Sequence, residues 1–240
     1  MKEEELYQMI NERGRSWNVS LVFPTLMRKV YIWMTLALVI TAVTAYGVAT
    51  SPALMTTIFT NKILFWGLII AELALVWGIS GAINRLSPAT ATLMFIAYSV
   101  INGATLSVIF AAFSTTAIVK TFVVTAGTFG AMSLVGYFTK KDLTSMGKLL
   151  FMALIGIIIA TIVNMFIASS GLDLIISYLG VLIFVGLTAY DTQKIKHMLS
   201  MAPDASEQMQ KYALLGSLTL YLDFINLFLY LLRIFGSNRN

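Results

Sequence analysis

The stretch LLFMALIGIIIATIVNMFIA, Leu149 to Ala168, contains no charged side chain and is apolar on every side of a helix. The hydrocarbon core of a bilayer, about 30 Å thick, is crossed by about 20 mostly apolar residues in helical conformation. Lipid offers no hydrogen-bonding partners to the backbone, so a helix is the conformation that satisfies all of its amide groups there. This stretch therefore predicts a transmembrane α-helix.

Six other apolar runs of comparable length predict six further transmembrane helices. With the first they lie at Val30 to Thr50, Ile63 to Ile83, Ala91 to Phe113, Ala117 to Phe138, Leu149 to Ala168, Leu172 to Tyr190 and Leu218 to Phe235. Most connections are short, so consecutive helices are expected to pack as antiparallel neighbours. We predict an all-α integral membrane protein, with an amino-terminal cytoplasmic segment (1–29), a seven-helix transmembrane domain (30–236) and a short tail (237–240).

Composition agrees with lipid as the solvent. The 240 residues are 58% hydrophobic and 11% charged, with a mean hydropathy of +0.85, whereas soluble domains are about 25% charged. The net charge of +5 comes from cations placed between apolar runs rather than in one patch, which argues against nucleic acid as a partner. Without cysteine and with His197 as the single histidine, the chain has no thiolate or histidine-rich metal site. We expect no enzymatic activity and no resident cofactor.

The amino terminus carries no sign of a cleaved secretory signal. Residues Met1 to Glu5 are acidic, and no apolar run begins before Val30. Orientation follows from the cations that flank the helices, because Lys and Arg are retained in the cytoplasm. Twelve lie on the side of the amino terminus, namely Lys2, Arg13, Arg15, Arg28, Lys29, Arg85, Lys140, Lys141, Lys148, Lys194, Lys196 and Lys211. Four lie on the other side, Lys62, Lys120, Arg233 and Arg239. We predict a cytoplasmic amino terminus and a carboxyl terminus outside.

Ionisable residues inside the predicted helices are candidates for function, because burying a charge in hydrocarbon costs about 2.5–3.5 kcal/mol on insertion scales. They are Glu72, Asp191, Asp223 and Arg233, with Arg85 at the end of the second helix. The seventh helix has the clearest pattern, a stripe with spacings of three and four that lies on one helical face. Its members are Gly216, Thr219, Asp223, Asn226, Tyr230 and Arg233. We expect this face, and Glu72, to point into the bundle, as the lining of a pore or as a seam between helices.

Whether Asp191 and Asp223 meet depends on where the seventh helix begins. At 1.5 Å of rise per residue, Asp191 lies about 28 Å along the sixth helix and close to the cytoplasmic surface. If the seventh helix begins at Tyr212, Asp223 lies about 16 Å deep and contact is not expected. If it begins at Leu218, the depth is about 7 Å and a pair becomes possible, with Arg85 near both. The sequence leaves both cases open, and a solvated carboxylate at a helix end is the alternative for Asp191.

Three segments resemble the Bax inhibitor-1 (transmembrane Bax inhibitor motif) family in its bacterial branch. They are FVGLTAYDTQKIK (184–196), LYLDFINLFLYLLRIFG (220–236) and, more weakly, GATLSVIF (103–110). The resemblance implies a seven-helix fold with helix 7 central, located in the bacterial inner membrane. It also implies a pH-sensitive calcium leak whose sensor is the pair Asp191 and Asp223, latched by an arginine of the second helix, here Arg85.

Two close carboxylates titrate in two separate steps, because both cannot easily be ionised at once. When both protons are lost, the pair would repel itself and attract Ca²⁺, a cation that prefers oxygen ligands. Two carboxylates make a weak site, so Asp191 and Asp223 are expected to hold Ca²⁺ only transiently. The expected partners are therefore the lipid bilayer, Ca²⁺ and protons, while the sequence names no protein partner.

Two other functions compete with a leak. A proton-coupled secondary transporter of unknown substrate could use Asp191, Asp223 and Glu72. The Tyr190-Asp191 pair with Asp223 also resembles the two aspartates of presenilin-type intramembrane proteases, in which a shared proton activates water. Those enzymes have glycines where this chain has Tyr221 and Leu222, so the protease is the weaker alternative.

Overall fold

The computed structural model describes residues 3–201 and 206–236, with side chains from residue 22 onward, and over these ranges the chain is helical without strands. The helices are α1 (Glu3–Ala49), α2 (Pro52–Thr60), α3 (Lys62–Ala82), α4 (Pro88–Leu106), α5 (Ile109–Ala112), α6 (Thr115–Phe138), α7 (Thr144–Ile167), α8 (Ser170–Ser200) and α9 (Glu207–Gly236). Seven segments of this described part are long and apolar enough to cross a membrane, with α4 and α5 together forming one of them. The predicted seven-helix bundle is confirmed.

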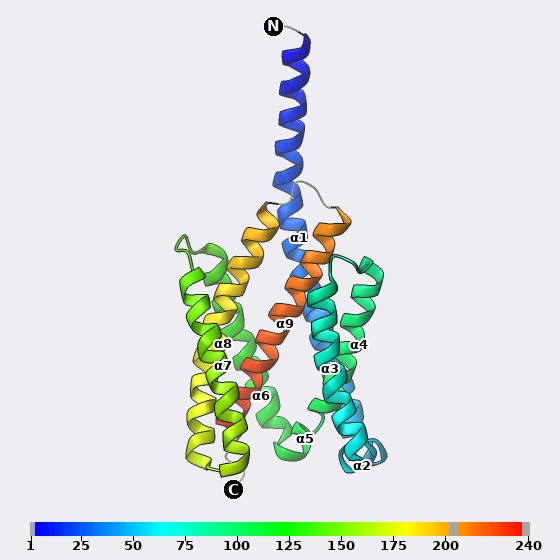
Figure 1. The fold of residues 1–240 in the computed structure, drawn as a ribbon, viewed down its shortest axis with the longest axis vertical. Coiled ribbons are helices and arrows are strands. Elements are labelled where there is room, and N and C mark those ends of the chain that lie inside the picture. The colour runs from blue at the N-terminus through cyan, green and yellow to red at the C-terminus, as the bar shows by residue number, and fades with distance from the viewer. Residues whose placement is uncertain (1–2, 202–205, 237–240) are drawn as a thin grey trace.

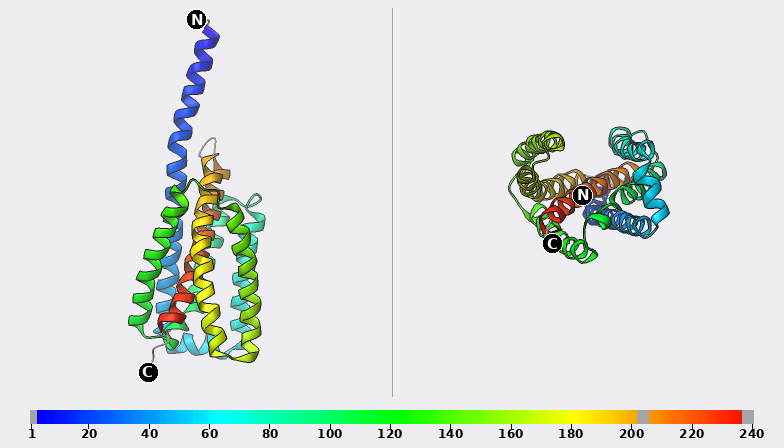
Figure 2. Two further views of the ribbon diagram at one scale, coloured as in Figure 1. Left: turned by 90° about the vertical axis from the view of Figure 1, so that its left-hand side faces the viewer. Right: turned by 90° about the horizontal axis from the view of Figure 1, so that it is seen from below.

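The long helices run lengthwise beside one another, and the two ends of the chain lie at opposite ends of the bundle (Figure 1). Helix α1 projects beyond the other helices at the amino-terminal end (Figure 2). Helix α9 crosses the middle obliquely and packs against α8, α1, α6 and α4. In the most apolar stretch of α9, 56% of the residues are buried, whereas only 6% are buried in the corresponding stretches of α3 and α7. Helix α9 is therefore central, as expected, and α3 and α7 are peripheral.

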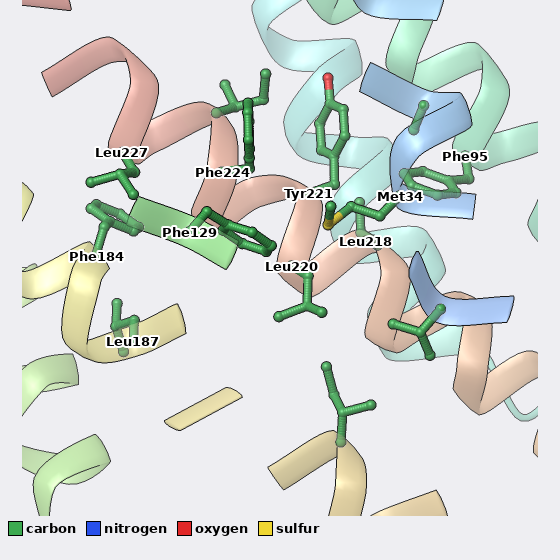
Figure 3. Close-up of a cluster of buried hydrophobic side chains, with 14 of the residues drawn as sticks. Met34, Phe95, Phe129, Phe184, Leu187, Leu218, Leu220, Tyr221, Phe224 and Leu227 are labelled. Carbon is green, nitrogen blue, oxygen red and sulfur yellow. The ribbon is translucent and has the colours of Figure 1, made fainter. Parts of the chain in front are cut away.

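The core forms around the apolar side chains of α9. Tyr221 has no exposed surface, and its ring makes edge contacts with the rings of Phe95 and Tyr98 from α4. On the other side of α9, Phe224 packs edge-on against Phe129 of α6. Figure 3 shows Phe95, Phe129, Tyr221 and Phe224 in this cluster around α9. Apolar residues bury most of the surface of α9, and the polar stripe is partly buried with it: Gly216 and Asp223 are buried, whereas Arg233 is exposed.

Close helix contact brings α6 and α8 together at a glycine. A Cβ added to Gly136 of α6 would collide with the backbone carbonyl of Ala189 on α8. Ala189 is two residues before Asp191, so this contact fixes the stretch of α8 that carries the carboxyl group. Gly130, on the same helix, has open space where its side chain would be.

The helix ends differ from the hydropathy prediction. Helix α1 is continuous from Glu3 to Ala49, so the expected boundary at residue 29 is not a break in structure. Helix α8 continues past Tyr190 to Ser200, and α9 begins at Glu207 rather than Leu218. Hydropathy detects the part of a helix that contacts hydrocarbon, whereas the polar turns at its ends stay helical through their own backbone hydrogen bonds.

Serine and proline define the starts of several helices. Ser87 accepts a hydrogen bond from the backbone N–H of Thr90, and Pro88 occupies the first turn of α4. Ser169 caps α8 in the same way. Such caps satisfy the free amide groups of the first turn. The run predicted at Ala91 to Phe113 is interrupted near Ser107, whose hydroxyl donates to the carbonyl of Ala104.

Candidate functional site

The structure brings Asp191 of α8 and Asp223 of α9 together inside the bundle. Asp223 is 5% exposed, and its carboxyl group lines the same cavity as that of Asp191 and is close enough to interact with it through charge. The Oδ2 atom of Asp223 is buried and has no hydrogen-bond partner among the described atoms. Ionised carboxylates only accept hydrogen bonds, so a bond between the two requires that one of them keeps a proton. The pair is therefore a place where a proton can be shared.

This contact corrects the depth argument, which had excluded it for a long seventh helix. Helix α9 is even longer than the longer alternative, since it begins at Glu207. The faulty assumption was that α8 ends at Tyr190. It runs about 14 Å beyond Asp191 to Ser200, while α9 covers about 24 Å from Glu207 to Asp223. Because α9 runs obliquely to the long axis of the bundle (Figure 1), Asp223 lies less deep in the bundle than the length of α9 before it would suggest.

A cavity of about 660 Å³ lies beside the pair, between α7, α8 and α9. Four members of the predicted stripe line it, namely Thr219, Asp223, Asn226 and Tyr230. Asp191, Lys148 and Lys194 also line it, so its wall carries both acidic and basic groups. Gly216 lies outside the lining and faces Ile195, where it allows α8 and α9 to approach each other.

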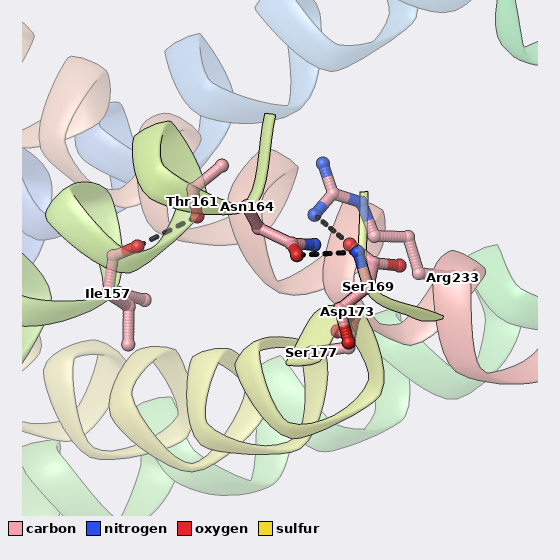
Figure 4. A network of polar contacts seen from close by, with 7 residues as sticks. All are labelled: Ile157, Thr161, Asn164, Ser169, Asp173, Ser177 and Arg233. Atoms are coloured by element: carbon pink, nitrogen blue, oxygen red, sulfur yellow. Dashed lines mark hydrogen bonds and ion pairs between the residues drawn. The ribbon is translucent and has the colours of Figure 1, made fainter. Parts of the chain in front are cut away.

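Arg233, the last member of the stripe, lies near the carboxyl-terminal end of α9. Its guanidinium is 3.7 Å from the carboxylate of Asp173 on α8 and 5.6 Å from the ring centre of Tyr230. Figure 4 shows this ion pair beside the turn between α7 and α8, where Asn164 accepts a hydrogen bond from the backbone of Ser169. Both charged side chains are about half exposed, so the pair is of the kind that contributes about 0–1 kcal/mol.

The structure does not bring Arg85 to the aspartates. It is exposed in the turn that follows α3, and α3 packs against α4 and α2. The cavity that Asp191 lines contains Lys194 instead, whose ammonium group lies 5.9 Å from the ring centre of Tyr190. The sequence could have indicated that Lys194 lies beside Asp191, because residues three positions apart on a helix are neighbours.

Glu72 belongs to a second polar cluster rather than to the cavity. Its carboxyl group contacts Thr105 at 2.6 Å and Asn102 at 3.3 Å, both on α4. The sequence predicted that Glu72 points into the bundle but gave it no partner. Thr105 and Asn102 lie 33 and 30 positions after Glu72, so these contacts depend on how α3 packs against α4 and do not follow from local sequence.

The fold and the two neighbouring aspartates together define a polytopic membrane protein with two carboxyl groups close to each other between two of its helices. Residues 24–240 match the family model described as inhibitor of apoptosis-promoting Bax1. The chain belongs to this family, the Bax inhibitor-1 family, as its motifs indicated.

Relatives match over nearly their whole length. The chain is 53% identical to inner membrane protein YbhL of Escherichia coli K12 over 216 residues. This match covers 90% of this chain and 92% of the relative. An uncharacterized protein of Borreliella burgdorferi is 50% identical over 214 residues, with 89% and 92% covered. One from Deinococcus radiodurans is 42% identical over 216 residues, with 90% and 91% covered. The likeness therefore extends over the whole bundle and includes a protein of the inner membrane.

Proposed function

We propose that the protein is a pH-sensitive leak for Ca²⁺ across the bacterial inner membrane, with Asp191 and Asp223 as its proton sensor. The observation that carries this proposal is that the two carboxyl groups lie near each other on the wall of the open cavity between α7, α8 and α9. While one proton is shared, the carboxyl groups attract each other and hold α8 against α9. When that proton is lost, two negative charges repel, and the opposing helices separate.

The same loss of a proton makes the site attractive to Ca²⁺. Ca²⁺ takes six to eight oxygen ligands in a tight site, whereas two carboxylates supply only part of such a shell. Among the side chains that the structure describes, those of residues 22–201 and 206–236, no group of three or more acidic, histidine or cysteine residues is placed to hold a metal. Weak binding of this kind suits passage of an ion rather than its storage, and it needs no protein cofactor.

Calcium entry into proteoliposomes between pH 6 and 8 tests the proposal. Flux is expected to rise with pH, because ionisation opens the contact between α8 and α9. It is also expected to need no second substrate inside the vesicles. Flux that appears only when a countersubstrate or an opposing proton gradient is supplied would instead identify a proton-coupled transporter. Absence of any calcium entry by folded protein would reject the leak.

The proposed direction of insertion has its own test. Because most cations flank the helices on the amino-terminal side, we propose that the amino terminus is cytoplasmic and the carboxyl terminus periplasmic. A reporter enzyme that works only in the periplasm, fused after Asn240, is expected to be active. The matched fusion before Met1 is the control and is expected to be inactive. The reverse pattern would contradict the proposed orientation.

Lys194 is expected to set the pH at which the leak responds. Its positive charge favours the ionised form of Asp191, so Lys194→Ala is expected to move the midpoint of the flux curve to higher pH. The expected shift is roughly 0.2–0.7 pH units, since a partly solvated charge pair contributes about 0.2–1 kcal/mol and one pH unit equals about 1.4 kcal/mol. Arg85→Ala is the matched control, because Arg85 lies in an exposed turn away from the pair. An equal shift in both variants would show that general surface charge is responsible.

A further inference from the structure

Glu72 is a carboxyl group within a membrane-spanning helix that no cation neutralises in the described part of the chain. Its hydrogen-bond partners there are the hydroxyl of Thr105 and the amide of Asn102, which are both neutral. The ion pair of the described residues joins Arg233 to Asp173 instead. A carboxylate with neutral partners in a bilayer is costly, whereas a protonated carboxyl group is not charged. Glu72 is therefore suited to bind a proton.

The surroundings of Glu72 satisfy both of its protonation states. The hydroxyl oxygen of Thr105 is 2.6 Å from Glu72 Oε1 and 3.0 Å from the backbone carbonyl of Asn102. When Glu72 is ionised, the Thr105 hydroxyl can donate to the carboxylate. When Glu72 is protonated, its own O–H can donate to Thr105, whose hydroxyl then rotates to donate to the Asn102 carbonyl. No heavy atom has to move for the proton to be gained or lost.

A chain of hydrogen bonds connects this carboxyl group to the central helix. Asn102 donates through Nδ2 to Glu72, and its Oδ1 accepts from the hydroxyl of Tyr221 on α9 at 2.9 Å. The Tyr221 hydroxyl is also 2.6 Å from that of Thr41 on α1. The bond from Tyr221 fixes which end of the Asn102 amide points at Glu72, because an amide that accepts on one side must donate on the other.

Two titratable side chains face Glu72 from the helices around it, the phenols of Tyr98 on α4 and Tyr221 on α9. Helix α2, which also packs against α3, has no ionisable side chain. Tyr221 and Asp223 are two residues apart, so they point about 200° apart around α9. The Glu72 cluster and the aspartate pair thus lie on opposite faces of the same helix.

We infer that Glu72 is a second proton-binding site, formed by Thr105 and Asn102 and linked to the central helix α9 by the hydroxyl of Tyr221. This inference does not depend on calcium conduction. It places α9 in contact with both carboxyl sites, with α8 through Asp223 and with the Glu72 cluster on α4 through Tyr221.

Infrared spectroscopy of the protein in liposomes measures the proton directly, because a protonated carboxyl group has a carbonyl band that a carboxylate lacks. The difference between wild type and Glu72→Gln is expected to contain one such band, which disappears as pH rises between about pH 5 and 9. The band is expected to remain in the double variant Asp191→Asn, Asp223→Asn, which separates it from the aspartate pair. Absence of a titrating difference band in folded protein would overturn the inference.

Chemical labelling gives a second measurement at the level of the residue. Dicyclohexylcarbodiimide takes up the proton of a carboxylic acid on nitrogen while the carboxyl oxygen adds to its central carbon. The adduct rearranges to a stable N-acylurea without loss of atoms. Mass spectrometry is expected to find this adduct on Glu72 with the same pH dependence as the infrared band. Labelling that does not change with pH would contradict a proton-binding role.

The link to α9 is tested by Tyr221→Phe. Without the Tyr221 hydroxyl, the Asn102 amide is free to turn, and ionised Glu72 loses a donor. The infrared band is then expected to persist to a pH roughly 1–2 units higher, since hydrogen bonds to charged groups contribute about 1.5–3 kcal/mol and one pH unit equals about 1.4 kcal/mol. Tyr178→Phe, on the exposed side of α8, is the matched control and is expected to leave the midpoint unchanged. Equal midpoints in Tyr221→Phe and wild type would overturn the link.

Discussion

Replacing Asp223 with asparagine is expected to flatten the pH dependence of calcium flux between pH 6 and 8. Asparagine has nearly the same shape but cannot be ionised, so the repulsion between α8 and α9 never develops. Asp191→Asn is expected to have the same effect, because a shared proton needs both carboxyl groups. Each single variant should thus lose most of the response that wild type shows in proteoliposomes.

The double variant distinguishes one titrating unit from two separate groups. If the carboxyl groups act together, the double variant adds little to either single variant, since effects within a unit are strongly non-additive. Asp173→Asn is the matched control on α8, because Asp173 is about half exposed and pairs with Arg233 at the far end of the helix. Partial losses that sum in the double variant would reject the shared proton.

Hydropathy predicted the number of membrane-spanning helices, because each apolar run is longer than the core of a soluble protein requires. It did not place the helix ends. The continuation of α8 to Ser200 consists of residues such as Gln193 and Lys196, which are polar in sequence but anchored in the structure. Gln193 bonds to the backbone of Lys141 and Leu143, and Lys196 donates to the carbonyl of Tyr137. Helix length there depends on tertiary contacts, which a hydropathy window does not contain.

The contacts of the candidate site were predictable to different degrees. The stripe on α9 followed from helical periodicity, and four of its members line one cavity. The meeting of Asp191 with Asp223 depends on the tilt of α9, which is set by packing against several helices at once and not by local sequence. Arg85 was assigned as the latch because the family resemblance implies an arginine of the second helix, whereas the structure places it in an exposed turn after the peripheral helix α3. Lys194 was within reach of the sequence, because it follows Asp191 by nearly one turn.

The contact between α6 and α8 leads to the second large expected effect, that of Gly136→Ala. A methyl group at this position would collide with the backbone carbonyl of Ala189, and a backbone cannot move aside as a flexible side chain can. Overpacking of this kind costs about 1–3 kcal/mol. For a chain of this size that corresponds to a decrease in Tm of roughly 2–12 °C.

Gly130→Ala provides the matched control, because it makes the same substitution on α6 where there is open space. Its Tm is expected to stay the same or to rise slightly, since alanine favours a helix by about 1 kcal/mol over glycine. Gly136→Ala should also alter the pH response of calcium flux, because the displaced segment of α8 carries Asp191 two residues after Ala189. Thermal unfolding in detergent compares the stabilities of the two variants, and flux in proteoliposomes compares their gating. Equal Tm values for the two glycine variants would show that α6 and α8 do not approach each other as closely as the structure has them.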